Sequence, residues 1–283
     1  MPDVPDFLDG AVDLHVHSAP DVDVRRFDDI ELASEAVRAR MGAILIKSHQ
    51  NSTVERAWLV SRFVPGIRVF GGLVLNETVG GLNPAAVRLA VSMGAKQVWM
   101  PTRSARNHRR YDGLPGGITV LDENGQLLPA AEEILQILSG SGCVLGTGHL
   151  SQEETFALIE RASALGGIKV LVTHPEWAPT FYSVAQQKTL AARGNVIFER
   201  CFVSTTHRCG FVPFETIEQA IAETGVENTV LSTDLGQPDT PAPVEGLRTY
   251  AARLRSTGFS VDDIRRMMQV NPARLLSLEK EHD

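Results

Sequence analysis

The chain has 283 residues, of which 43% are hydrophobic and 22% are charged, and this is an ordinary composition for a folded globular protein. Its formal net charge of −7 argues against a nucleic acid or an anionic membrane surface as partner. Three cysteines do not build a disulfide framework, the N-terminus has no signal-peptide pattern, and no apolar run reaches membrane-spanning length, so we expect a cytoplasmic protein.

Short apolar runs alternate with helical patterns along the whole chain. The predicted strands are residues 11–16, 43–46, 67–75, 97–100, 144–147, 168–172, 196–198 and 229–232. Helix start signals lie between them, such as Asn83-Pro84 and the capping-box pattern of residues 151–154. This alternation is typical of βα units with a parallel sheet. We therefore expect one (β/α)8 TIM-barrel domain over residues 1–283.

Two predicted loops are long, namely residues 18–27 after the first strand and residues 101–128 after the fourth. Loops that follow the strands lie on the catalytic face of such barrels, and long loops are often functional. At the other end of the chain, residues 260–278 are predicted to form two helices, with Asn271-Pro272 opening the last.

The first predicted strand ends in a pair of histidines. His15 and His17 are separated by one residue, so on a strand both side chains point to the same face. Two imidazoles on one face can bind one metal ion at nitrogen–metal distances of about 2.0–2.1 Å. A buried histidine bonded to a backbone carbonyl is the alternative for either residue alone.

Other chemistry-bearing residues follow predicted strands in the same way. His49 follows the second strand, His149 the fifth, His174 the sixth and Asp234 the eighth. The top of a barrel brings these strand ends together. Asp234 could bind a metal through one oxygen and accept a proton from water through the other. Its alternative role is a helix N-cap.

This ordered set resembles the amidohydrolase superfamily, which carries H-x-H on the first strand, histidines on the fifth and sixth, and aspartate on the eighth. The closing segment, residues 260–278, is similar to that of phosphotriesterase-like hydrolases. The resemblance implies one or two divalent ions, commonly zinc, and hydrolysis of an amide, lactone or phosphoester. It implies catalytic roles for Asp234 and His174. The implied metal ligands are His15, His17, His149, His174 and Asp234.

The fourth strand departs from the pattern of binuclear family members, which carry a carboxylated lysine or a glutamate at its end. Here that end reads Met100-Pro101-Thr102. On the second strand, His49 or a carboxylated Lys47 could supply a bridging ligand. The alternatives are that Lys47 pairs with a carboxylate and that His49 contacts only substrate. The number of metal ions stays open.

The loop after the fourth strand is rich in cations. It holds four arginines and a histidine, which are Arg103, Arg106, His108, Arg109 and Arg110. Such a cluster can bind an anionic substrate group, although a solvated loop surface is the commoner role. Arg103 and Lys47 are the candidate substrate-binding residues.

Three further functions compete with a metal-dependent hydrolase. One is a mononuclear, non-hydrolytic member of the same superfamily, such as a decarboxylase. Another is a phosphoesterase of the polymerase and histidinol phosphatase type, whose opening resembles residues 13–18. The last is a barrel that holds metal for structure alone. We expect a small-molecule substrate as partner, no nucleic acid and no membrane, and self-association into a homo-oligomer is left open.

Overall fold

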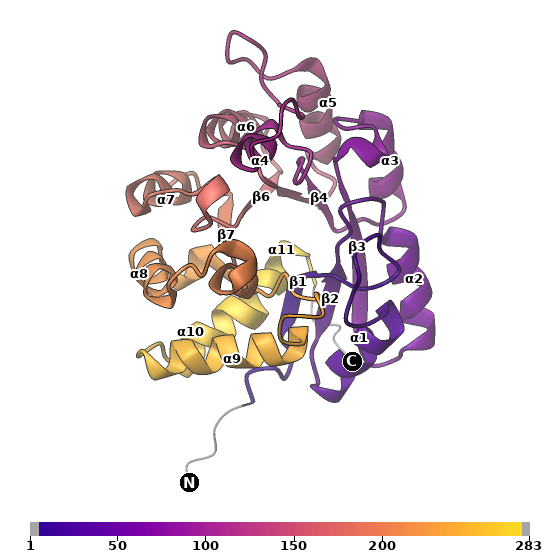
Figure 1. The fold of residues 1–283 in the computed structure, drawn as a ribbon, viewed down its shortest axis with the longest axis vertical. Coiled ribbons are helices and arrows are strands. Elements are labelled where there is room, and N and C mark those ends of the chain that lie inside the picture. The colour runs from indigo at the N-terminus through magenta and orange to yellow at the C-terminus, as the bar shows by residue number, and fades with distance from the viewer. Residues whose placement is uncertain (1–5, 279–283) are drawn as a thin grey trace. The chain divides into compact units, whose positions relative to one another are not determined.

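The computed structural model describes residues 6–278 and contains all eight predicted strands (Figure 1). The strands are β1 Val12–Val16, β2 Ala43–Ile46, β3 Arg68–Val74, β4 Gln97–Trp99, β5 Val144–Gly146, β6 Lys169–Thr173, β7 Val196–Cys201 and β8 Thr229–Ser232. Their bounds agree with the prediction to within one residue at each end, except that β7 continues through Glu199, Arg200 and Cys201.

Helices follow the strands, and several begin where the sequence indicates. They are α1 Asp29–Arg38, α2 Val54–Phe63, α3 Pro84–Ser92, α4 Arg106–Tyr111, α5 Pro129–Leu138, α6 Gln152–Leu165, α7 Val184–Ala191, α8 Phe214–Thr224, α9 Pro243–Ser256, α10 Val261–Arg265 and α11 Asn271–Leu275. Asn83 caps α3, with Pro84 in its first turn. Ser151 and Glu154 form the predicted capping box of α6. Among residues 6–278, no helix combines the length and apolar character that a membrane crossing requires.

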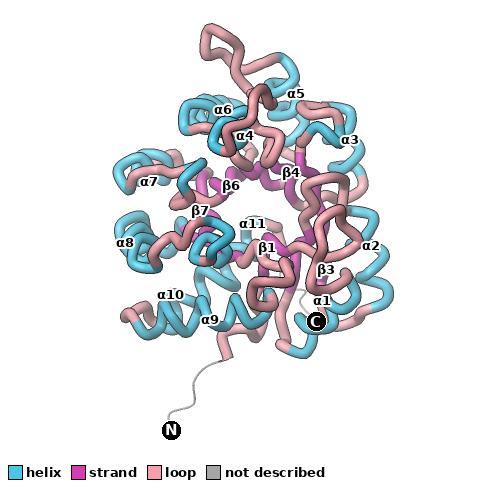
Figure 2. The backbone as a smooth tube through the Cα atoms, viewed as in Figure 1, coloured by secondary structure: helices cyan, strands magenta, loops and turns pink. Residues whose placement is uncertain are grey.

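The sheet has the strand order of a (β/α)8 barrel. Its order is β1 to β8 in sequence, and the pairs β1–β2, β3–β4, β4–β5, β5–β6 and β6–β7 are parallel. Figure 2 shows strands in magenta and helices in cyan alternating along the chain. The predicted (β/α)8 fold class is therefore confirmed.

The described residues form two compact units. The first unit comprises Arg56–Phe70 and the described parts of Met1–Ile46 and Arg200–Asp283, and the second comprises Lys47–Glu55 and Gly71–Glu199. Each unit has its own apolar core, one around Ile44, Leu231 and Met267, the other around Val98, Leu145 and Phe198. The expectation of one domain over residues 1–283 stays a prediction.

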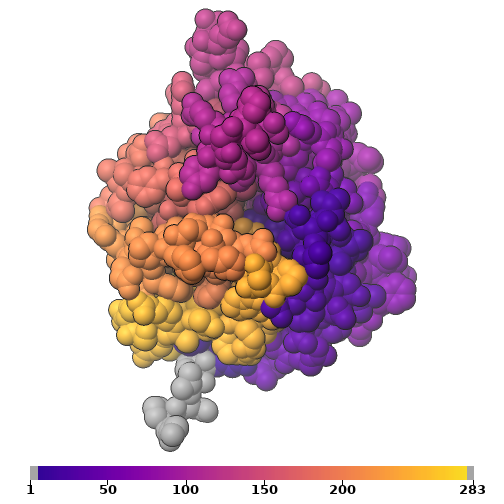
Figure 3. All heavy atoms as spheres, in the orientation of Figure 1, coloured from indigo at the N-terminus to yellow at the C-terminus, as the bar shows by residue number. Residues whose placement is uncertain are grey.

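The long loop predicted at residues 101–128 and the closing segment at residues 260–278 both contain helices. The loop after β4 contains one short helix, α4, which the sequence did not indicate, and this segment stands in magenta on the visible face of Figure 3. The closing segment forms α10 and α11, joined by a π-helical turn at Arg266–Val270. Asn271-Pro272 opens α11, as predicted.

Candidate metal site

Two buried histidines at the end of β1 point at one carboxylate in the first unit. His15 lies in β1 and His17 directly follows it, and their exposed fractions are 0% and 1%. The Nε2 atoms of His15 and His17 lie 3.0 and 2.9 Å from Oδ1 of Asp234. The i, i+2 spacing therefore brings both imidazoles to the same face of the strand, where they share one oxygen atom.

The backbone after β8 positions that carboxylate. The N–H of Asp234 donates to the carbonyl of His15 at 2.7 Å. Asp234 has a φ of 51°, in the left-handed region that few non-glycine residues adopt, although aspartate is among those that tolerate it. The next helix, α9, begins only at Pro243, so Asp234 does not cap it. An unusual conformation at a residue that contacts two histidines points to a functional constraint.

A buried hydrogen-bond network joins β1 to the residues that precede Asp234. The Asp13 carboxylate accepts hydrogen bonds from the backbone N–H groups of His15 and Thr233, both at 3.1 Å, and from the Thr233 hydroxyl at 2.6 Å. Burial raises the pKa of Asp13 to about 7, while these donors act in the opposite direction. The network fixes the backbone on both sides of the His15–Asp234 contact.

The outer nitrogens of the two histidine rings also have neighbours. Nδ1 of His15 lies 3.7 Å from the Cys201 thiol at the end of β7, and Nη2 of Arg25 lies 3.4 Å from Nδ1 of His17. Burial lowers the pKa of His17 to about 3, although the hydrogen bond to Asp234 raises it. His17 is therefore neutral at physiological pH, which is the state that binds metals.

These donors fit a divalent metal ion. His15, Cys201 and Asp234 offer ligand atoms that all lie within 4.8 Å of one another. Two nitrogen or oxygen ligands at about 2.0–2.1 Å from one ion are roughly 3.3 Å apart in tetrahedral geometry. The observed separations of 3.0 and 2.9 Å to Asp234 are close to that value. Imidazole, carboxylate and thiolate together form a ligand set that zinc accepts.

In the second unit, His49 belongs to a buried hydrogen-bond network. Its Nδ1 lies 2.9 Å from the hydroxyl of Thr102, which follows β4. Asn76 donates both to that hydroxyl at 2.8 Å and to the backbone carbonyl of His49 at 2.9 Å. The residues after β2, β3 and β4 thus hold the imidazole of His49 in one orientation.

His149 contacts a histidine to which the sequence assigned no role of its own. Its Nδ1 lies 2.9 Å from Nδ1 of His108 on α4, and the two rings stack with centroids 4.7 Å apart. His108 Nε2 lies 3.2 Å from Oδ2 of Asp112. Burial lowers the pKa of His108, Asp112 raises it, and Arg103 lowers it further. His108 and Asp112 have the i, i+4 spacing of a helical pair, a signal that could have found them.

His174 shows the same backbone feature as Asp234. Its φ is 53°, and the Thr180 hydroxyl donates to its carbonyl oxygen at 2.6 Å. Its ring lies 5.6 Å from that of His149 and 5.6 Å from that of Trp177, measured between centroids. The Trp177 ring also lies 5.5 Å from that of His108, between centroids. Trp177 therefore packs beside the histidines of the second unit.

The candidate substrate-binding residues differ in their surroundings. Lys47 is buried, and its Nζ lies 5.3 Å from the centroid of the Trp99 ring, within cation–π range. Arg103 is exposed in the loop after β4. Tyr182, which follows β6, is buried in the apolar core of the second unit and has a packing role.

The sequence did not predict the contacts that two residues, Cys201 and His108, make with the histidines. Cys201 reaches His15 because β7 continues through two polar residues, and His108 reaches His149 because α4 folds within the predicted loop. The structure places His15, His17 and Asp234 together in the first unit, and His49, His149 and His174 in the second. Their roles as metal ligands, and the contribution of Arg103 to substrate binding, stay predictions.

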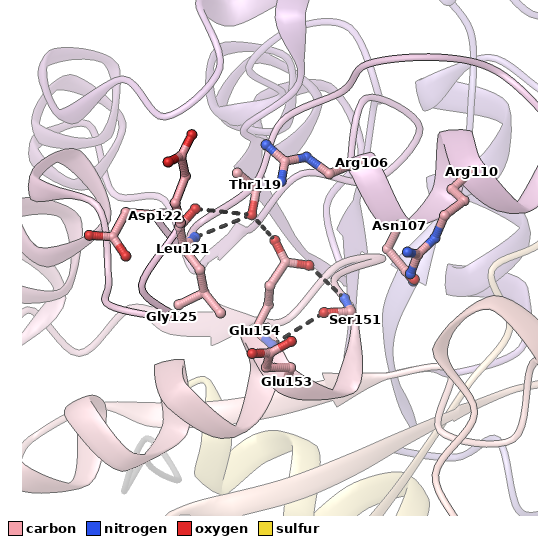
Figure 4. A pocket seen from close by; sticks show the side chains of 11 residues that line it. Arg106, Asn107, Arg110, Thr119, Leu121, Asp122, Gly125, Ser151, Glu153 and Glu154 are labelled. Atoms are coloured by element: carbon pink, nitrogen blue, oxygen red, sulfur yellow. Dashed lines mark hydrogen bonds between the residues drawn. The ribbon is translucent and has the colours of Figure 1, made fainter.

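A pocket of about 340 Å³ in the second unit is lined by Arg106 and Arg110 of the cation cluster, but by none of the predicted metal ligands and by neither Lys47 nor Arg103. It lies between α4, the segment around Asp122 and the start of α6. Figure 4 shows Glu154 between Thr119 and Ser151, with hydrogen bonds to both. Glu154 also accepts from the backbone N–H of Val120 at 3.1 Å. The capping box of α6 therefore also anchors the loop that carries α4.

Solved structures share the fold of this chain at low sequence identity. An amidohydrolase from Pseudomonas aeruginosa superposes with a TM-score of 0.67 at 12% identity, covering 96% of each chain. The probable dipeptidase PvdM from the same organism gives 0.66 at 10% identity and 94% of each chain. A 2,6-dihydroxybenzoate decarboxylase gives 0.56 at 14% identity, covering 95% of this chain and 99% of that one. The resemblance to amidohydrolases is thus confirmed for the fold.

Comparison at the level of sequence families gives one assignment. A search of curated proteins found no match. One family model, described as a family of unknown function (DUF6282), matches residues 10–198, which is more than half of the chain. The matched segment begins just before β1 and ends within β7. The chain therefore belongs to the family DUF6282.

Proposed function

We propose that this protein is a metal-dependent hydrolase whose ion is bound by His15, His17 and Asp234. The observation that carries the proposal is that the Nε2 atoms of two buried histidines at the end of β1 lie against a single carboxylate oxygen. A divalent metal bound there would lower the pKa of a water molecule to about 7 and polarise the electrophilic carbonyl or phosphoryl group of a substrate. Zinc is the ion that this ligand set suits best.

The residues of this chain would have different roles in the reaction. The imidazoles of His15 and His17 supply neutral nitrogen ligands, and the low pKa of His17 keeps it in that form. Asp234 would accept the proton that the attacking water loses, because a carboxylate has two oxygens and can bind an ion through one and a proton through the other. The Asp13–Thr233 network holds these groups in register. His149 and His174 are proposed to complete the ligand set, with His174 also acting on substrate.

The substrate class follows from the same chemistry. A site that activates water and polarises a carbonyl suits an amide or a lactone, and a phosphoester is the other class that such a site attacks. The structural neighbours include a probable dipeptidase, which supports an amide as the first class to test. A second ion would require a bridging ligand, for which His49 or a carboxylated Lys47 is proposed. Carboxylation of Lys47 is tested by the ¹³C NMR spectrum of protein prepared with labelled bicarbonate, which should show a carbamate signal.

A decarboxylase is the second candidate, since the residues that follow β4 are Met100, Pro101 and Thr102 rather than a lysine or glutamate. This departure favours a single ion, and the solved structures of the same fold include a decarboxylase. A metal content near one per chain together with carbon dioxide release from aromatic carboxylates would support it. Hydrolysis without carbon dioxide release would exclude it.

The deciding experiment is metal analysis combined with an activity screen. Wild-type protein, a His15→Ala/His17→Ala double variant and a His207→Ala control are purified in parallel, since His207 is half exposed and pairs with Asp239. We expect metal in the wild type and the control but not in the double variant. The screen covers dipeptides, cyclic amides, lactones and phosphoesters. Equal metal content in all three proteins would overturn the assignment of His15 and His17.

A further inference from the structure

A chain of three side chains runs through the second unit from the surface to His149. Asp112 is about half exposed at 45%, the side chain of His108 is 14% exposed, and His149 is 5% exposed. The contacts along the chain are Asp112 Oδ2 to His108 Nε2 at 3.2 Å and His108 Nδ1 to His149 Nδ1 at 2.9 Å. The first contact is an ion pair if His108 is protonated and a charge–dipole contact if it is neutral, and the second is a hydrogen bond.

The surroundings hold His108 in this position. Its ring stacks on that of His149 with an interplanar angle of 27°, and Trp177 packs against both rings at 5.5 and 5.1 Å. The neighbouring residue Asn107 donates to the carbonyl oxygens of His149 at 3.2 Å and of Pro179 at 2.7 Å. α4 is therefore fastened to the backbone of the histidine that its own His108 contacts.

The chain of contacts has one favoured polarity when both rings are neutral. The negative charge of Asp112 favours the tautomer of His108 that carries its proton on Nε2, the ring nitrogen 3.2 Å from Asp112 Oδ2. The Nδ1 of His108 then has a lone pair and accepts the proton carried by Nδ1 of His149. His149 is left with a lone pair on Nε2. A metal-binding histidine usually donates its other ring N–H to a carboxylate, a backbone carbonyl or water, and here the acceptor would be the imidazole of His108.

The opposite polarity would either turn the Nε2 lone pair of His108 toward the Asp112 carboxylate or require a second proton on His108. The neutral ring with its proton on Nε2 avoids both arrangements.

We infer that Asp112 and His108 form a relay that locks His149 in the tautomer with a lone pair on Nε2. Both are positioning residues, because they act through His149. That His149 uses this lone pair for a metal ion rests on the proposed function, whereas its tautomer does not. The relay also gives α4, the helix inserted after β4, a role in assembling the site.

Histidine tautomers can be read directly by NMR. Two-bond ¹H–¹⁵N correlation spectra of the metal-free protein, labelled at histidine nitrogens, show which ring nitrogen carries the proton. We expect the proton on Nδ1 of His149 and on Nε2 of His108. A proton on Nε2 of His149 in the metal-free wild type would overturn the relay, whatever the protein binds.

Three variants test the parts of the relay. His108→Phe keeps an aromatic ring for stacking but has no ring nitrogen, and Asp112→Asn replaces the obligate acceptor with a group that can also donate. Both should give His149 a mixture of tautomers. Asp112→Glu keeps a carboxylate and should retain the wild-type tautomer. If Asp112→Asn leaves the tautomer of His149 unchanged, Asp112 does not set the polarity, and the inference fails for it.

Metal affinity gives an independent readout. Loss of a partner behind a metal-binding histidine costs about 10–100-fold in affinity. We expect Kd for zinc to rise by that factor in His108→Phe and Asp112→Asn. The matched control is Asp239→Asn, which removes a carboxylate 2.9 Å from Nε2 of the half-exposed His207 and should leave Kd unchanged. Zinc binding with wild-type Kd in both relay variants would refute a role of the relay in metal binding through His149 and leave the metal site at His15, His17 and Asp234 standing. The expected tautomers in a protein that binds no metal would do the reverse.

Discussion

At the scale of single residues, the contact of one Asp234 oxygen with two imidazoles defines the candidate site in the first unit. Asparagine has nearly the same shape as aspartate but cannot take a proton from water. We expect Asp234→Asn to lower kcat by about 10²–10⁴-fold, the usual contribution of a positioned general base. The remaining histidines should preserve much of the metal content.

The test of Asp234→Asn measures kcat, metal content and melting temperature together, on a substrate found by the screen. A purely structural aspartate would change the melting temperature and leave turnover nearly intact. A variant with near wild-type turnover and a full complement of metal would therefore remove Asp234 from the mechanism.

Thr233 supports the site from behind through its hydrogen bonds to Asp13. Thr233→Val keeps the shape of the side chain but removes the hydroxyl that donates to Asp13 at 2.6 Å in a fully buried setting. A buried polar group that loses its partner costs about 1–3 kcal/mol. We expect the free energy of unfolding in denaturant to fall by that amount, with a parallel loss of metal affinity.

Thr249→Val is the control for this substitution, because the Thr249 hydroxyl is exposed on α9 and donates to the Glu245 carbonyl. It should change the free energy of unfolding by a few tenths of a kcal/mol at most, as surface substitutions commonly do. If Thr233→Val and Thr249→Val change the free energy of unfolding equally, the hydrogen bond from Thr233 to Asp13 does not stabilise the fold.

At the scale of elements, the strands were predictable because each is a short apolar run between turn signals. β2 and β8 were predicted with their observed bounds, since residues 43–46 and 229–231 are apolar or β-branched and the runs are flanked by glycine or polar residues. The end of β7 was missed because Glu199 and Arg200 are buried charged residues, and burial of charge depends on partners that only tertiary structure supplies.

α4 was missed for a related reason. Its sequence, Arg-Asn-His-Arg-Arg-Tyr, has no apolar periodicity, and contacts with distant residues hold it in place. The N–H of Arg106 donates to the carbonyl of Ile118, and Asn107 donates to backbone carbonyls after β5 and β6. The contact between His108 and His149 could therefore not be predicted from local sequence, although the placement of the other histidines after strands was readable.

The turn after β8 depends on a glycine. Gly236 has a φ of 137°, and a Cβ atom there would lie 2.0 Å from the backbone oxygen of His17. Gly236→Ala should therefore displace the backbone of His17 and lower metal affinity as well as stability. Metal titration and denaturant unfolding measure the two effects.

Gly258→Ala is the control for Gly236→Ala, because it adds backbone strain without a steric contact. Gly258 also has a positive φ, 106°, but a Cβ there meets nothing within 4 Å. This variant should lose stability through backbone strain alone and bind metal like the wild type. If Gly236→Ala binds metal equally well, the close approach of its backbone to His17 has no part in the site.

Glu154 couples α6 to the loop that carries α4. Its carboxylate accepts from the Thr119 hydroxyl at 2.6 Å, from the Val120 N–H at 3.1 Å and from the Ser151 N–H at 2.8 Å. Glu154→Ala should speed hydrogen exchange at residues 118–121 and destabilise the protein by about 1–3 kcal/mol. The control is Glu153→Ala, which changes the exposed neighbour. If hydrogen exchange at residues 118–121 is as slow in Glu154→Ala as in Glu153→Ala, Glu154 does not anchor the loop.

At the scale of the whole molecule, a metal that binds only the folded chain must stabilise it. The stabilisation is RT ln(1 + [L]/Kd), about 2.7 kcal/mol at a free metal concentration one hundred times Kd. Because a domain of this size shifts its Tm by about 2 °C per kcal/mol or slightly less, zinc should raise the Tm by roughly 5 °C. Thermal unfolding followed by circular dichroism, with and without zinc, measures the shift, and a chelator should reverse it.

The variants make this thermal shift specific to the site. The His15→Ala/His17→Ala protein should lose most of the shift because it lacks two of the proposed ligands. His207→Ala removes a half-exposed histidine and should retain the full shift. Single His149→Ala and His174→Ala proteins extend the test to the second unit, where each predicted ligand should reduce the shift at a fixed zinc concentration. A shift of equal size in the double variant and the wild type would place the stabilising ion elsewhere on the chain, and His15 and His17 would then have no role in binding it.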